Sequence, residues 1–105
     1  MIPKAGETWF VDFGMTAKPR WAFVVAEARD SRLAIATVVK ITTEYGGTPY
    51  EVTLPRVPWL REQSYVNAQS LQPVKFSELT RKAPGQFDPP VLAAVRSAIR
   101  RWLQL

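Results

Sequence analysis

The chain has 105 residues, 47% of them hydrophobic and 22% charged, so it can fill one core and has no room for a second. It contains neither Cys nor His, which excludes a disulfide scaffold, a thiolate metal site, a Cys nucleophile and a Ser-His dyad. Its net charge of +5 favours a polyanion or an acidic protein as partner, although a small basic domain that is merely soluble remains the plain alternative.

Segments rich in aromatic and β-branched residues predict strands along the first half of the chain. The predicted strands are residues 7–13, 20–28, 33–43 and 49–54. One or two more short strands are expected within residues 64–74, whereas the proline-bounded residues 55–61 are expected to be irregular. Residues 77–86 are predicted to form a polar connection, with one helical turn near residues 76–79.

The end of the chain predicts an amphipathic helix over residues 88–103. Asp88 is a favourable N-cap, and Pro89 suits the first helical position because its missing N–H costs nothing there. The apolar residues that follow fall on one stripe at helical spacing. They are Val91, Leu92, Val95, Ile99, Trp102 and Leu103. Short strands without helical crossovers, followed by one covering helix, predict a small and strongly bent barrel.

The residues that could carry chemistry are few. No Asp/Glu cluster has metal-ligand spacing, and no Gly-rich loop could cradle a phosphate. What remains is the chemistry of Arg, Thr, Ser and Tyr at the ends of strands. This set suits contact with a phosphodiester, because Arg can neutralise a phosphate with two hydrogen bonds and keeps its charge.

Short segments spaced along nearly the whole chain form an ordered pattern. They are Gly6-Glu7-Thr8-Trp9, Val11-Asp12-Phe13, Lys18-Pro19-Arg20-Trp21 with the apolar run after it, Val39-Lys40-Ile41-Thr42-Thr43, Pro49-Tyr50-Glu51-Val52, Tyr65-Val66-Asn67-Ala68-Gln69 and Gly85-Gln86-Phe87. This pattern resembles the MazF/PemK/Kid family of bacterial toxins. The resemblance implies one mainly β domain over residues 1–105, an SH3-like half-open β-barrel with a C-terminal α-helix.

The resemblance also implies a function. Its members are metal-independent endoribonucleases that cut single-stranded mRNA, need no cofactor, form homodimers and are silenced by an antitoxin, here expected to be an acidic protein. By the family motif, Arg20 and Thr42 would be catalytic, and Lys18, Thr43 and Gln69 would contact the RNA substrate. No apolar run reaches the length of about 18 residues that a membrane span needs, and no signal peptide is visible. A cytoplasmic location is therefore expected.

The chain departs from the family pattern after Gln69. Some members carry a second Arg and an acid there that serve cleavage, whereas residues 70–74 of this chain contain neither. A non-catalytic barrel that binds nucleic acid or a protein therefore stays open as an alternative. A gyrase poison like the CcdB toxins, which act through a C-terminal Trp, is a third interpretation. We expect Trp102 to be buried in the helix stripe, which argues against it.

Overall fold

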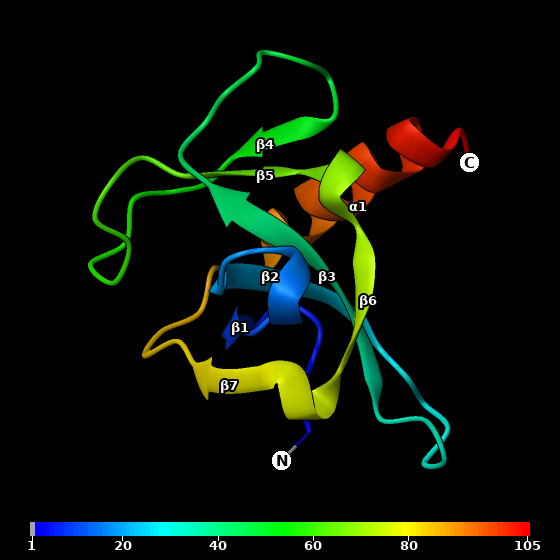
Figure 1. Ribbon diagram of the computed structural model, residues 1–105. Coiled ribbons are helices and arrows are strands. Elements are labelled where there is room, and N and C mark those ends of the chain that lie inside the picture. Colours follow the sequence, from blue (N-terminus) through cyan, green and yellow to red (C-terminus); the bar gives the residue numbers. More distant parts are fainter. Residues whose placement is uncertain (1) are drawn as a thin grey trace.

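The structure is a computed structural model that describes residues 2–105 (Figure 1). Within these residues it has seven strands, three short 3-10 helices and one α-helix at the C-terminal end. In chain order the elements are β1 (Thr8–Val11), η1 (Gly14–Thr16), β2 (Arg20–Glu27), β3 (Ile35–Thr42), β4 (Glu51–Thr53), β5 (Tyr65–Asn67), η2 (Ala68–Ser70), β6 (Gln72–Lys75), η3 (Phe76–Glu78), β7 (Leu79–Lys82) and α1 (Pro89–Leu103).

Antiparallel pairing around β3 organises the sheet. The strand order is β4-β5-β3-β2-β1-β7, and β6 pairs with the first half of β3 while β5 pairs with its end. In the part of the chain that the structure describes, β4 and β7 do not pair, so the bent sheet forms a half-open barrel. This is the mainly β architecture with a C-terminal helix that the sequence predicts.

Alternation along β2 divides the core into two clusters. Phe23 and Val25 point toward α1, and both are buried with Val95 of the helix. Ala22 and Val24 point the other way, into the bent sheet, where they pack in the second cluster. The sheet is therefore covered on both faces, which explains why residues 22–25 form an unbroken apolar run.

One strand lies where the sequence predicts only a polar connection. β7 contains a single apolar residue, Leu79, which is buried, and its other three residues are exposed. It pairs with β1 through the backbone, with Phe10 opposite Arg81. An edge strand with charged side chains gives no alternating pattern in the sequence, so this part of the prediction was wrong for a physical reason. The predicted helical turn before it is confirmed as η3.

The predicted helix is confirmed as α1, but its last turn is not core. Val91, Val95 and Ala98 are buried, whereas Trp102 is 40% exposed. The helix extends beyond the short strand β4, so its last turn is not covered by the sheet (Figure 1). The Trp102 ring packs edge-on against Tyr50, with ring centroids 5.3 Å apart. The expectation that Trp102 is buried was wrong, so it no longer argues against a gyrase poison. The part of the chain that the structure describes contains no helix with the length and apolarity that crossing a bilayer requires.

These burial differences predict unequal costs of truncation. Phe23→Ala should lower the free energy of unfolding by about 3–5 kcal/mol, because its ring is fully buried between the sheet and α1. Trp102→Ala should cost less than this, because Trp102 is 40% exposed and loses a smaller buried area together with one aromatic pair. Urea denaturation at a single protein concentration measures both values. Equal losses would contradict the exposed position of Trp102.

The carboxylate of Glu7 ties the start of the chain to β7. It accepts hydrogen bonds from the backbone N–H of Lys4 (2.8 Å) and Nε1 of Trp9 (3.1 Å), and it pairs with Nζ of Lys82 at 2.8 Å. Burial by itself raises the pKa of Glu7, but the hydrogen bonds from Lys82, Lys4 and Trp9, together with the Lys82 charge, outweigh it. The pKa of Glu7 therefore lies below its ordinary value.

The lowered pKa makes a prediction about acid stability. Ionised Glu7 stabilises the fold above the unfolded-state pKa, which is about 4.3 for a glutamate, and this contribution is lost as the pH falls through the lower folded-state pKa. Glu7→Gln should therefore be less stable than the wild type at neutral pH and should lose less stability on acidification. Thermal melts between pH 7 and pH 3 measure this. An identical pH dependence in both proteins would contradict the role of Glu7.

Candidate functional site

The pairing of β2 with β3 brings the two predicted catalytic residues to one rim of the barrel. Ala22 lies opposite Lys40, and continuing this register by two residues places Arg20 opposite Thr42. Arg20 begins β2 and Thr42 ends β3, so both belong to the same end of the strand pair. The two residues are far apart in sequence, and antiparallel pairing alone makes them neighbours, as the sequence predicts.

Both residues line one pocket with a volume of about 270 Å³. Thr43 lines it too, immediately after β3. The segment between β4 and β5 supplies a third side, including Arg61 and Glu62. The residues that line the pocket thus include two arginines, two threonines, Ser64 and one glutamate, which is a set suited to holding a phosphodiester.

The guanidinium group of Arg20 has no partner within residues 2–105. Its Nε atom is buried and forms no hydrogen bond. A buried donor without a partner costs about 1–3 kcal/mol, and the cost is larger for a charged group. The unpaired Arg20 guanidinium can therefore bind an anion that enters the pocket.

Thr42 is oriented by the loop that follows β3. Its Oγ1 atom accepts a hydrogen bond from the backbone N–H of Glu44 at 3.1 Å. Because the oxygen acts as the acceptor in this contact, the hydroxyl hydrogen is available to donate to an incoming oxygen. The side chain can therefore serve as a hydrogen-bond donor toward the pocket.

An aromatic wall carries a third arginine beside the pocket. Phe10 and Trp21, which both line the pocket, pack edge-on with ring centroids 5.3 Å apart. The guanidinium carbon of Arg81 lies 5.3 Å from the Phe10 centroid and 5.2 Å from the Trp21 centroid. These cation–π contacts hold the Arg81 charge in place at the border of the pocket.

Trp59 covers the end of the barrel next to this wall. Its ring lies 6.0 Å from that of Trp21 and 5.2 Å from that of Phe87, which is buried. The backbone of Gly85 approaches it so closely that a Cβ atom there would lie 2.8 Å from the Trp59 Nε1 atom. The position of Trp59 between prolines favours a lid on the barrel over a contact with RNA or antitoxin, and these contacts make it a packed lid.

The other two predicted substrate-binding residues lie outside this pocket. Lys18 is exposed in the loop before β2. Gln69 is exposed in η2, where its Oε1 accepts a hydrogen bond from Nδ2 of Asn67 at 3.3 Å. Neither lines the pocket around Arg20, so contacts of Lys18 and Gln69 with RNA remain predictions.

Sequence reasoning missed Arg61 and Glu62. Arg61 ends the proline-bounded segment and Glu62 follows it, and because this segment has no periodicity, nothing in the sequence indicates where it folds. A pair of opposite charges at the end of such a segment was the only available signal. In the described residues, no three or more Asp and Glu side chains gather in a group that could hold a metal ion.

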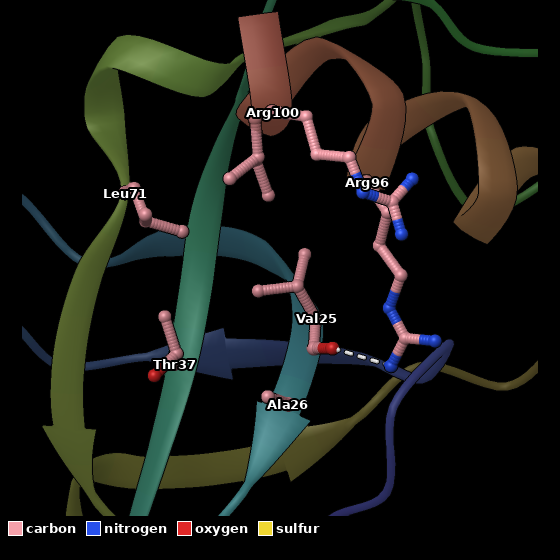
Figure 2. A pocket seen from close by; sticks show the side chains of 7 residues that line it. Val25, Ala26, Thr37, Leu71, Arg96 and Arg100 are labelled. Carbon is pink, nitrogen blue, oxygen red and sulfur yellow. Dashed lines mark hydrogen bonds between the residues drawn. The ribbon is translucent and has the colours of Figure 1, made fainter. Parts of the chain in front are cut away.

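A second pocket, of about 270 Å³, lies between α1 and the strands β2 and β3 (Figure 2). It is lined by apolar side chains together with Arg96 and Arg100. Arg96 is already engaged there, because its Nη2 donates a hydrogen bond to the backbone oxygen of Val25 at 2.9 Å (Figure 2). This arrangement makes Arg96 a contact between helix and sheet, and the predicted site residues lie elsewhere.

The sequence matches the family of PemK-like, MazF-like toxins of type II toxin-antitoxin systems over residues 4–103, so this chain belongs to that family. No curated protein sequence matches it. Its fold is similar to that of an endoribonuclease bound to its cognate antitoxin from a mycobacterial species, with a TM-score of 0.82, 24% identity, and coverage of 98% of this chain and 96% of that one.

Two further solved structures share the fold. MazF from Deinococcus radiodurans has a TM-score of 0.82 and 23% identity, with 100% of this chain and 99% of that one covered. The Mycobacterium tuberculosis toxin MazF-mt6 has a TM-score of 0.76 and 22% identity, with 94% of this chain and 97% of that one covered. These matches confirm the MazF-like half-open barrel with its C-terminal helix.

The unpaired guanidinium of Arg20 should lower the stability of the fold, and this can be tested by replacing it. Arg20→Met keeps part of the apolar stem and removes the guanidinium, so the free energy of unfolding should rise by about 1 kcal/mol. Arg81→Met is the matched control, because it removes a guanidinium that stacks on two rings and should lower stability by about 0.5–1 kcal/mol. Urea denaturation of both variants decides the point. A destabilised Arg20→Met would mean that Arg20 has a structural partner.

Proposed function

We propose that this chain is an endoribonuclease toxin that cuts single-stranded mRNA in the cytoplasm, without a metal ion, and is neutralised by an antitoxin protein. One observation carries the proposal: the unpartnered Arg20 lies opposite Thr42 in one pocket at the barrel rim. Membership in the toxin family adds to it. We also propose that residues 1–105 form a single domain.

The proposed reaction is an internal transesterification of the RNA backbone. The ribose 2′-oxygen attacks the adjacent phosphorus, the bond from phosphorus to the 5′-oxygen breaks, and a 2′,3′-cyclic phosphate and a free 5′-hydroxyl result. Negative charge grows on the phosphoryl oxygens in the transition state. Arg20 would neutralise it with a charge that it never loses, and the Thr42 hydroxyl would donate to one of these oxygens.

Charge and surface composition support the proposed partners. An endoribonuclease and the Deinococcus MazF have each been solved with an antitoxin, and the net charge of +5 suits an acidic antitoxin for this chain. We also propose a homodimer, because Leu33 and Ile35, which line one hollow at the start of β3, expose apolar surface that a second copy could cover. Single-stranded RNA suits the pocket, because unpaired bases could stack beside the Phe10–Trp21 wall.

The test is cleavage of a single-stranded RNA library. The wild type should cut it in the presence of EDTA and leave cyclic phosphate ends. Arg20→Ala should lower the cleavage rate by about 10²-fold or more, as expected for loss of one transition-state donor. Thr42→Val should also lower the rate. Product sequencing and gel electrophoresis measure both effects.

Arg29→Ala is the charge-matched control. Arg29 is exposed just after β2, at the opposite end of that strand from Arg20. Its removal changes the net charge equally and should leave the rate unchanged. RNA binding without cleavage by the wild type would favour the non-catalytic barrel instead. Equal cleavage by wild type and Arg20→Ala would mean that another group stabilises the transition state.

A further inference from the structure

The proposed reaction needs an acceptor for the 2′-hydroxyl proton. The chain contains no His and no Cys, so the most common proton acceptors at neutral pH are missing. Arginine keeps its proton, and a threonine hydroxyl is a weak base. A carboxylate is therefore the group to look for in the pocket.

Glu62 is the only carboxylate that lines the Arg20 pocket in the described part of the chain. It comes from the segment between β4 and β5, far in sequence from both Arg20 and Thr42. Most other acids already have structural tasks. Asp30 pairs with Arg32 at 2.7 Å, for example, and Glu51 accepts hydrogen bonds from the backbone of Gly46 and Thr48.

The backbone that carries Glu62 is anchored, although its side chain is exposed. The carbonyl oxygen of Glu62 accepts a hydrogen bond from Oγ of Ser64 at 2.9 Å. Nε2 of the neighbouring Gln63 donates to the carbonyl oxygen of Leu54 at 2.6 Å. Within residues 2–105 the Glu62 carboxylate itself forms no hydrogen bond and no ion pair. The backbone of this segment is therefore held by hydrogen bonds, while the Glu62 carboxylate is free to contact a ligand in the pocket.

We infer that Glu62 is the general base of the proposed cleavage reaction. The inference rests on the proposed function. The Glu62 carboxylate takes the proton of the 2′-hydroxyl as the 2′-oxygen bonds to phosphorus. The 5′-oxygen leaves and takes a proton from solvent, and Glu62 afterwards returns its proton to solvent, so protons and charges balance.

The charged groups around Glu62 fit this role. Arg20 and Arg61 line the same pocket and can hold a phosphate beside the Glu62 carboxylate. Arg20 also neutralises the phosphate oxygens, which keeps the carboxylate and the phosphate from repelling each other strongly. The hydroxyl groups of Thr42 and Thr43 remain as donors, so acceptor and donors come from different strands.

Glu62→Gln tests the inference, because it keeps the size of the side chain and removes its basicity. Single-turnover kinetics on a single-stranded RNA should show the rate constant at saturation falling by about 10²-fold or more. RNA binding should stay equal or tighten, because a negative charge near the phosphate is gone. The pH dependence of the rate should differ between the two proteins, which a purely structural role of Glu62 would not produce.

Asp88→Asn is the charge-matched control. Asp88 is exposed directly before α1, its side chain forms no capping hydrogen bond, and it does not line the pocket, so its replacement changes the net charge equally. It should retain the wild-type rate, and thermal melts should show that both variants are folded. Wild-type rates in Glu62→Gln, or equal losses in both variants, would overturn the inference while the proposed cleavage stands. A wild type that does not cut RNA would overturn both.

Discussion

The antiparallel pairing of β2 with β3 is the constraint on which the rest of the molecule depends. It is the central strand pair, and every other strand joins the sheet by pairing with β2 or β3 or with one of their neighbours. A bulge between Val24 and Ala26 bends the pair, so the sheet can curl around one cluster while α1 covers the other face. The same register sets Arg20 opposite Thr42. Fold and pocket thus follow from one pattern of hydrogen bonds.

The pocket illustrates a compromise between stability and binding. The aromatic wall gives Arg81 a favourable place over two rings, whereas Arg20 lies a short way along the rim with a buried Nε atom that has no partner. A sequence selected for stability alone would pair or replace such a charge. An anion in the pocket would complete the environment of this side chain, which makes Arg20 the leading candidate for phosphate binding.

The sequence predicted the structural features that depend on hydrophobic periodicity and on strand pairing. The apolar runs of β2 and β3 indicated both strands, and antiparallel geometry then placed Arg20 near Thr42. The sequence-based prediction missed the features that depend on tertiary packing. β7 forms because an exposed edge strand meets β1 through its backbone, and Trp102 is exposed because the helix is longer than the sheet it covers. The position of Glu62 depends on how an irregular segment returns to the barrel, and no local pattern encodes that path.

The pocket is lined partly by central strands of the sheet and partly by an irregular segment, and these two walls differ in how easily their backbone hydrogen bonds open. Arg20 and Thr42 lie on the central strand pair, which can separate only when the whole sheet melts. Arg61 and Glu62 lie on a segment held by a few hydrogen bonds, such as that from Gln63 to Leu54. Amide groups of this segment can open by local fluctuation more often than those of the strand pair, although its hydrogen bonds and the buried Leu60 keep it in place on average. Amide exchange would therefore be fast on one wall of the pocket and slow on the other.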